Sequence, residues 1–316
     1  MAVFLFHLLP VFNFLGLEST WYEAVCSIGY IGVDVFFVIS GYVMAQSSGG
    51  LSVGLDSVKS FAIKRLLRVY LGFWPMFLLM LLLFVVYQPE FLSTGNLVLS
   101  FLLLNPVQEQ LIIPPAWSLT YELYFYLIIA LSLFLLPKYR LWVVVVMFLV
   151  SAVSTLLSDQ DHFFISYFLM EFALGYFVYG FANRLKNYID IKSALVLVSL
   201  SMAAFVLWGI LAVGVTRVLT AGLFSACLLH LLLLETRQLI LPVWLQKFGD
   251  ASYTLYLLHM IVINAVMATG MSQWFKDQGL ALVFYITVVV LTVLMSLFLY
   301  TKLEKPVYKS AVKKLS

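Results

Sequence analysis

The stretch LLRVYLGFWPMFLLMLLLFVVY, residues 66–87, decides the fold class of this chain. It contains no charged residue after Arg68, and it is long enough to cross a bilayer as one helix, which takes about 20 apolar residues. The rest of the chain has the same character, since 64% of its 316 residues are hydrophobic and 10% are charged. A soluble globular domain carries roughly 25% charged residues. The composition therefore predicts an all-α integral membrane protein.

Ten apolar stretches of this kind follow one another along the chain. They are residues 1–17, 25–45, 66–87, 117–136, 140–157, 162–182, 193–213, 215–234, 251–270 and 280–301. Residues 95–105 are apolar but too short to span, so we expect them to lie at the interface or to re-enter. Because no repeat or linker divides the chain, we predict one transmembrane domain over residues 1–316, a bundle of about ten helices.

Basic residues indicate the orientation of these spans, because cytoplasmic loops carry an excess of Lys and Arg. If both termini are cytoplasmic, 16 of the 18 basic residues fall on that side, and Arg217 and Lys276 fall outside. The 16 are Lys59, Lys64, Arg65, Arg68, Lys138, Arg140, Arg184, Lys186, Lys192, Arg237, Lys247, Lys302, Lys305, Lys309, Lys313 and Lys314. The sequence predicts a multi-pass protein with two cytoplasmic termini. Its net charge of +3 is explained by these loops, so we expect contact with membrane lipids and none with nucleic acid.

The cysteines argue against a metal site, and the N-terminal residues argue against a cleaved signal peptide. Cys26 and Cys227 lie far apart and form no metal-ligand spacing, so we expect two buried apolar residues and no metal site. Residues 1–17 lack a basic region and an Ala-x-Ala site, so we do not expect a cleaved signal peptide.

Ionisable side chains inside spans are costly and are therefore candidates for functional sites. Glu122 shares a helical stripe with Ser118 and Tyr126, so its carboxylate is expected to face a polar seam. Glu122 could belong to a functional site, or it could be a structural residue that is hydrogen-bonded between two helices. His259, in ASYTLYLLH (251–259), is explained as well by a packed histidine as by a catalytic one.

Three further ionisable residues lie inside predicted spans. Asp34 lies among small residues such as Gly41, which let helices approach closely, and it could bind a ligand or bridge helices. For Glu171 we favour a structural role. His7 precedes Pro10, which removes a helix hydrogen bond and often bends a span where a site forms.

A compact cationic patch, Lys64, Arg65 and Arg68, lies where the third span leaves the cytoplasm. Ordinary anchoring explains it, with Tyr70 and Trp74 as part of an aromatic belt. The alternative is a site for a phosphate-rich cytoplasmic ligand, since arginine pairs bind phosphates bidentately.

Five segments together resemble one family. They are GVDVFFVISGY (32–42), KRLLRVY (64–70), WSLTYELYFYL (117–127), FGDASYTLYLLH (248–259) and LEKP (303–306). Their order and spacing resemble the acyltransferase 3 family, bacterial membrane-bound enzymes that acylate sugars, and its exopolysaccharide-production branch in particular. The resemblance covers nearly the whole chain.

The resemblance implies roles for matching positions. The first-span histidine regarded as essential matches His7, and the acyl-coenzyme A contacts match Arg65 and Arg68. The remaining matches are Ser40, Gly41, Trp117, Glu122, Tyr253 and His259. Two positions depart from the family. The basic residue usual about ten positions before the histidine is absent, which suggests an upstream start or a shortened form, and Leu71 replaces the proline usual after Tyr70.

The residues fit one mechanism best. We expect His7 to act as general base, with Glu122 orienting it or binding the acceptor. Lys64, Arg65, Arg68 and Tyr70 are expected to hold acyl-coenzyme A, with acetyl-CoA as co-substrate and no permanently bound cofactor. Asp34, Ser40, Trp117, Tyr253 and His259 are expected to bind a glycan or lipid-linked oligosaccharide acceptor.

The expected location is the bacterial inner membrane. Two alternatives stay open: a transporter of a small anionic or glycan-related substrate, since buried carboxylates and histidines also line translocation paths, and a non-catalytic component of a polysaccharide synthesis complex.

Overall fold

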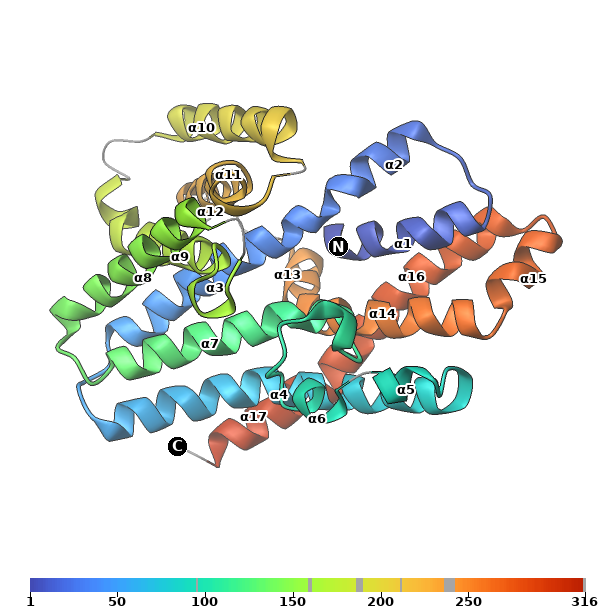
Figure 1. Ribbon diagram of the computed structural model, residues 1–316, viewed down its shortest axis with the longest axis horizontal. Helices are drawn as coiled ribbons and strands as arrows, with labels where there is room; N and C mark the ends of the chain where they lie inside the picture. The colour runs from blue at the N-terminus through green and yellow to red at the C-terminus, as the bar shows by residue number, and fades with distance from the viewer. Residues whose placement is uncertain (95, 159–160, 186–189, 211, 236–241, 315–316) are drawn as a thin grey trace. The chain divides into compact units, whose positions relative to one another are not determined.

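The computed structural model describes residues 1–94, 96–158, 161–185, 190–210, 212–235 and 242–314. Lys186 and Arg237, two of the basic residues predicted to be cytoplasmic, lie outside the described residues, and the Arg184 side chain is not described. In the described ranges the secondary structure is helical throughout, with no strand (Figure 1). This confirms the predicted all-α fold.

The chain forms two compact units, each built from separate stretches of sequence. Unit 1 comprises Met1–Tyr30, Lys64–Thr120 and Pro242–Ser316, and unit 2 comprises Ile31–Ile63 and Tyr121–Leu241. Helices α4 (Leu55–Tyr87) and α7 (Trp117–Ser132) contribute residues to both. That the whole chain acts as one domain stays a prediction.

Unit 1 holds the first helices and the C-terminal part of the chain. Its longer helices are α1 (Ala2–Phe14), α2 (Thr20–Ser27), α13 (Val243–Asp250), α14 (Ser252–Ala268), α15 (Met271–Asp277), α16 (Ala281–Leu299) and α17 (Lys305–Lys313). Its shorter turns are η1 (Ile28–Tyr30), α5 (Phe91–Thr94), α6 (Leu97–Phe101), η2 (Gln108–Gln110), η3 (Pro114–Ala116) and η7 (Tyr300–Glu304).

An apolar core joins α1, α14 and α16 of unit 1. Helix α1 contributes Phe4, Leu8, Val11 and Phe12, and Leu15 follows directly after it; their spacing forms one buried stripe. Facing residues come from α14 and α16, and the Tyr22 and Tyr285 hydroxyls lie 2.6 Å apart at its edge. Because of this core, the side of α1 that carries His7 faces α14.

Two irregular joints shape the C-terminal part of unit 1. Helices α13 and α14 form a bent pair with an angle of 61° at Ala251. Between α16 and α17 the π-helical turn η7 inserts an extra residue into the helix, a device often found at functional sites. Helix α17 then runs beside α4 (Figure 1).

Unit 2 is built mainly around α3 and α9. Its helices are α3 (Ile31–Gly49), α8 (Pro137–Leu157), α9 (Phe168–Leu185), α10 (Ile191–Ala204), α11 (Gly214–Arg217) and α12 (Leu223–Glu235), with turns η4 (Phe163–Ile165), η5 (Phe205–Gly209) and η6 (Val218–Gly222).

Two glycines let α3 and α9 pack with their backbones in contact. A methyl group added at Gly41 of α3 would overlap the Phe172 carbonyl of α9, and one added at Gly175 of α9 would overlap the Val38 carbonyl of α3. The prediction that small residues in 29–41 permit close helix packing is confirmed for Gly41.

Seven helical segments in the described residues are long and apolar enough to cross a membrane, or eight if the α13–α14 pair counts as one span. The other two predicted spans form helices too, but α1 has 13 residues and α7 has 16. Helix α1 is short because the chain turns at Gly16, whose φ is +71°. Helix α7 begins at the predicted residue, Trp117, and is short because it ends at Ser132, ahead of Pro137, the first residue of α8. The predicted number of about ten is therefore approximate.

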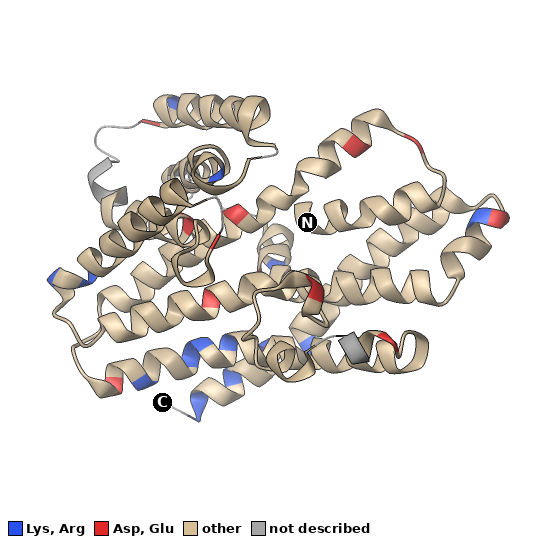
Figure 2. Ribbon diagram, viewed as in Figure 1, with Lys and Arg blue, Asp and Glu red and all other residues tan. Residues whose placement is uncertain are grey.

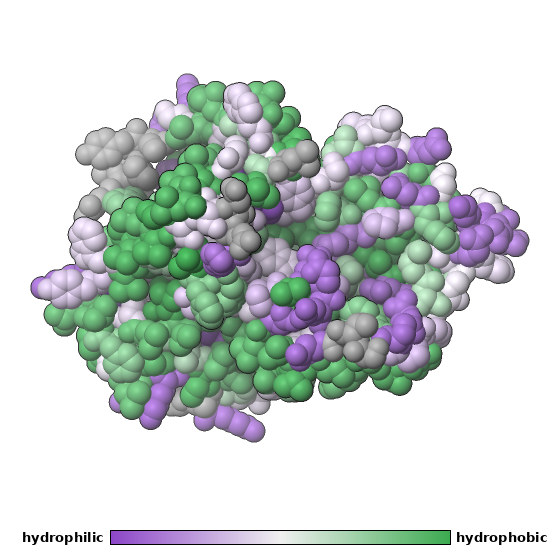
Figure 3. Space-filling model, in the orientation of Figure 1, coloured by the Kyte–Doolittle hydropathy of each residue, from purple (hydrophilic) through white to green (hydrophobic). Residues whose placement is uncertain are grey.

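The exposed faces of these helices are apolar. On α4, Leu78, Leu82 and Val86 are 57–61% exposed and recur at helical spacing. Hydrophobic side chains (green) cover much of the visible surface over α4 and α8 (Figure 3). Such surfaces suit a hydrocarbon solvent, which fits a multi-pass membrane protein.

Candidate active site

Two histidines from opposite ends of the chain meet inside unit 1. His7 of α1 and His259 of α14 approach with Nδ1 of His7 3.1 Å from Nε2 of His259, and their ring centroids lie 5.1 Å apart. His259 is fully buried, whereas His7 is partly buried. The resemblance assigns functional roles to both positions, and the structure brings them together.

The surrounding carbonyl groups determine where the protons of this pair lie. Nδ1 of His259 is 3.1 Å from the Leu255 carbonyl oxygen, and Nδ1 of His7 is 2.9 Å from that of Val3. Because a carbonyl oxygen only accepts, each Nδ1 must carry a hydrogen. The single Nδ1–H of His7 is then shared between two acceptors, the Val3 carbonyl oxygen and Nε2 of His259. The same tautomer leaves Nε2 of His7 unprotonated, as a general base requires.

Hydrogen bonds also join two of the sequence motifs beside the histidines. The hydroxyls of Ser118 in α7 and Tyr256 in α14 lie 2.8 Å apart, and the Tyr256 hydroxyl donates to the Pro115 carbonyl at 2.5 Å. The Tyr256 ring lies 6.0 Å from that of His259. These bonds connect segment 117–127 with segment 248–259. A polar seam that Ser118 shares with Glu122 stays a prediction.

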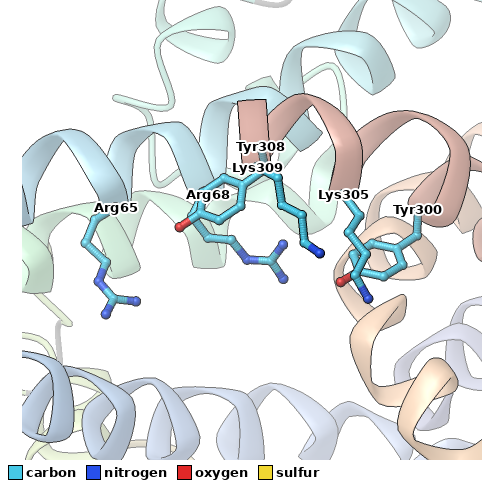
Figure 4. A pocket seen from close by; sticks show the side chains of 6 residues that line it. All are labelled: Arg65, Arg68, Tyr300, Lys305, Tyr308 and Lys309. Carbon is cyan, nitrogen blue, oxygen red and sulfur yellow. The ribbon is translucent and has the colours of Figure 1, made fainter. Parts of the chain in front are cut away.

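A cationic cavity of about 370 Å³ opens between α4 and the η7–α17 segment of unit 1. It is lined by Arg65 and Arg68 of α4 and by Tyr300, Lys305, Tyr308 and Lys309. The two guanidinium groups and the two ammonium groups project into the same space (Figure 4). Lys and Arg also gather along α4 and α17 more widely (Figure 2). We refer to this cavity as the cationic pocket.

The structure separates the predicted donor-binding residues into two groups. Arg65 and Arg68 line the pocket, but Lys64 is exposed beside it and Tyr70 is not among the lining residues. The Tyr70 hydroxyl donates to the Leu102 carbonyl at 2.6 Å, and its ring lies 4.9 Å from that of Trp74. Tyr70 therefore fastens the α6 region onto α4.

Tyr253, predicted to bind the acceptor, lies instead against Arg68. The Arg68 guanidinium carbon is 5.5 Å from the centre of the Tyr253 ring, within the range of a cation–π contact. The Tyr253 hydroxyl donates to the Val69 carbonyl at 2.8 Å. This places Tyr253 beside the pocket, and its assignment to the acceptor stays a prediction.

In unit 2, Glu122 is buried within a polar network. Its Oε1 accepts hydrogen bonds from Ser40 at 3.1 Å and from Tyr126 at 2.5 Å. The contact with Tyr126 confirms part of the predicted stripe, and Ser40 joins α3 to α7. Among the described residues the His7 ring is hydrogen-bonded to the Val3 carbonyl and to His259, so the expected support of His7 by Glu122 stays a prediction.

Asp34 forms a buried ion pair in unit 2 with a residue from a distant span. Nε and Nη2 of Arg217 donate to its two carboxylate oxygens at 2.8 and 2.9 Å. Both oxygens of the buried Glu171 lack a hydrogen-bond partner among the described residues. Trp117, the remaining predicted site residue, is partly buried at the first position of α7.

Sequence reasoning missed the contribution of the C-terminal residues to the pocket. The sequence pattern places Lys305 and Lys309 among the cytoplasmic basic residues, Lys305 also in the LEKP segment, and Tyr300 in the span 280–301, but it gives none of them, nor Tyr308, a role in binding. Lys302, Lys305 and Lys309 recur at helical spacing, and that pattern could have indicated a basic helical face.

Comparison with known proteins identifies the family. A family description, "Acyltransferase domain" of the acyltransferase 3 type, matches residues 1–301. The chain belongs to the acyltransferase 3 family. Within this family it is similar to the exopolysaccharide production protein ExoZ of Rhizobium meliloti (strain 1021), with 29% identity over 262 residues, which cover 78% of this chain and 80% of that protein. No solved structure matches. The resemblance predicted from five motifs is confirmed.

Proposed function

We propose that this acyltransferase 3 protein transfers an acyl group, expected to be acetyl, from acyl-coenzyme A to a sugar hydroxyl. The acceptor is an exopolysaccharide or another cell-surface glycan, or its lipid-linked precursor. The family membership supports acyl transfer, and the similarity to a protein named for exopolysaccharide production supports the glycan.

The observation that carries the proposed donor is the cationic pocket. Coenzyme A bears a diphosphate and a ribose phosphate, so a site for it needs several cations in a small volume. Two arginines and two lysines converge here on a cavity of about 370 Å³, within the usual range of ligand pockets. Arginine can bind phosphate oxygens bidentately, and the lysines add compact charges. The ring of Tyr308 offers a face for the adenine, whereas the Tyr300 ring lies against the Lys305 ammonium group.

The histidine pair supplies the chemistry of the transfer. Nε2 of His7 accepts the proton of the sugar hydroxyl while the oxygen attacks the thioester carbonyl carbon. The carbon–sulfur bond then breaks, and the imidazolium returns the proton to the departing thiolate, so no net proton is consumed. His259 holds the His7 ring through the Nδ1–H and favours the reactive tautomer.

The acceptor is proposed to interact with the polar residues that the donor site does not use. Ser40 and Glu122 form one hydrogen-bonded pair in unit 2, and Asp34 forms an ion pair there with Arg217. Carboxylates and hydroxyls are suitable partners for sugar hydroxyls. Trp117 adds an aromatic face at the start of α7.

The proposed location is the bacterial inner membrane, with both termini in the cytoplasm. The pocket then opens on the side on which cells hold acyl-coenzyme A. Single-cysteine labelling in intact cells at Lys276, which is expected outside, and at Lys309, which is expected inside, tests this orientation. Labelling of Lys309→Cys by an impermeant reagent in intact cells would refute it.

The transfer is tested in a strain that lacks this protein and is complemented with variants. We expect His7→Ala to abolish acyl incorporation into the polysaccharide at a normal level of protein in the membrane. Unchanged incorporation by such a variant would refute the catalytic role.

The donor site is tested separately by binding of labelled acetyl-CoA to the purified full-length protein. We expect Lys309→Ala to weaken binding about five- to tenfold, the loss of roughly one charge-assisted hydrogen bond at a half-open site. Lys302→Ala is the matched control, because Lys302 is a neighbouring exposed lysine that does not line the pocket. Equal loss in both variants would indicate a general effect of charge.

A further inference from the structure

Glu304 is a buried carboxylate at the end of the π-helical turn η7, directly before the pocket residue Lys305. It belongs to the LEKP segment, to which the proposed function assigns no role. Its side chain is 6% exposed, whereas that of Arg68 is 36% exposed. A carboxylate so close to the cationic pocket lowers the net positive charge of the pocket. Its position there therefore indicates a function other than direct binding of an anion.

Both oxygens of Glu304 are engaged by side chains from other helices. Nη1 of Arg68 donates to Oε1 at 2.6 Å, and the Thr254 hydroxyl donates to Oε2 at 2.5 Å. Glu304 thus connects α4 with the first turn of α14. Because it is buried and both oxygens accept bonds, it does not present its charge directly to a bound anion.

The consequence for Arg68 is a defined orientation. A lysine or arginine side chain loses rotamer entropy when it is fixed, and it loses less on binding a ligand if its orientation is already held. The bond to Glu304 fixes one end of the guanidinium, and the Tyr253 ring supports its face at 5.5 Å. Gly72, one turn beyond Arg68, leaves the space that Tyr253 and Glu304 fill. The bond to Glu304 uses one of the five N–H donors of Arg68, and the guanidinium still lines the pocket.

We propose that Glu304 is a positioning residue for the acyl donor, because it holds the Arg68 guanidinium in the orientation that receives a phosphate. This inference rests on the proposed function of the cationic pocket. Through Thr254 the same contact fixes α4 to the helix that carries His259. Five residues separate Thr254 from His259, a rise of about 7.5 Å along α14. One rigid helix therefore relates the phosphate site to the histidine pair.

A double-mutant cycle on the full-length protein tests the proposal. The variants are Glu304→Ala, Arg68→Ala and the double substitution, and the readouts are KM for acetyl-CoA, KM for the acceptor, and kcat. We expect Glu304→Ala to raise the donor KM about fivefold and to leave the acceptor KM within about twofold. In the Arg68→Ala background it should add nothing, since residues that act through one another are not additive.

Glu304→Gln keeps the shape of the side chain and serves if Glu304→Ala does not accumulate in the membrane. It should raise the donor KM by a smaller factor, roughly twofold, and again have no effect without Arg68. An unchanged donor KM in both Glu304 variants, or an undiminished effect in the Arg68→Ala background, would overturn the positioning role. An unchanged donor KM in Arg68→Ala itself would instead overturn the donor site.

Discussion

The histidine pair allows a quantitative prediction about a residue that does not touch the reacting atoms. In His259→Ala, Nδ1 of His7 loses its acceptor 3.1 Å away but keeps the Val3 carbonyl at 2.9 Å. The lost contribution is therefore that of one hydrogen bond, about 1–1.5 kcal/mol. This corresponds to a decrease in kcat of roughly five- to twelvefold. Removal of the base in His7→Ala should cost about 100-fold or more.

His259→Gln distinguishes orientation of His7 from simple packing. The amide oxygen of glutamine can reach the position of Nε2 and accept the Nδ1–H of His7. We expect His259→Gln to recover most of the kcat lost in His259→Ala, whereas His259→Leu fills the volume and should not.

The assay for this series is acetyl transfer by purified protein at saturating acetyl-CoA and acceptor, with the yield of folded protein measured in parallel. Equal kcat for the Gln and Leu variants would refute the hydrogen-bond argument. A kcat of His259→Ala equal to that of the wild type would also refute it.

Three predictions concern unit 2. Gly41→Ala forces α3 away from the Phe172 carbonyl, which should lower the free energy of unfolding by about 1–3 kcal/mol. A thermal unfolding midpoint unchanged from wild type would contradict the close packing of α3 and α9. Asp34→Ala removes the buried carboxylate that accepts two hydrogen bonds from Arg217 and should cost roughly 3–5 kcal/mol. The double variant Asp34→Ala/Arg217→Ala should unfold at a higher temperature than Asp34→Ala, and an equal or lower midpoint would argue against the ion pair. Glu122→Gln retains an acceptor for Ser40 and should raise the acceptor KM while the donor KM stays constant; a change confined to the donor KM would contradict the proposed acceptor side.

The sequence contained enough information for the fold class and for most elements. Apolar length alone located every predicted span, because a helix in lipid must satisfy its backbone internally and so needs a long apolar run. Residues 1–17 and 117–136 form shorter helices because local signals near their C-terminal ends, at Gly16 and at Pro137, stop the helix, and hydropathy does not register such signals.

The site was only partly predictable for a related reason. Arg65 and Arg68 were found because they are neighbours in sequence, whereas His7 and His259 are 252 residues apart and no periodicity relates them. The two basic residues that break the positive-inside pattern form specific contacts, which the sequence pattern did not indicate. Arg217 binds Asp34, and Lys276 donates to the Phe14 carbonyl at the end of α1 at 2.6 Å.

The discontinuous composition of unit 1 has a consequence for how the protein is made. Its N-terminal stretch Met1–Tyr30 and its middle stretch Lys64–Thr120 enter the membrane well before Pro242–Ser316 is synthesised. Translation proceeds at about 5–20 residues per second, so His7 and the α4 arginines wait for seconds without His259, Glu304 or the α17 lysines. Neither the histidine pair nor the cationic pocket exists in a nascent chain. A chain that stopped after unit 2 would lack His259 and the α17 lysines, so the assembly of both features waits for the synthesis of Pro242–Ser316.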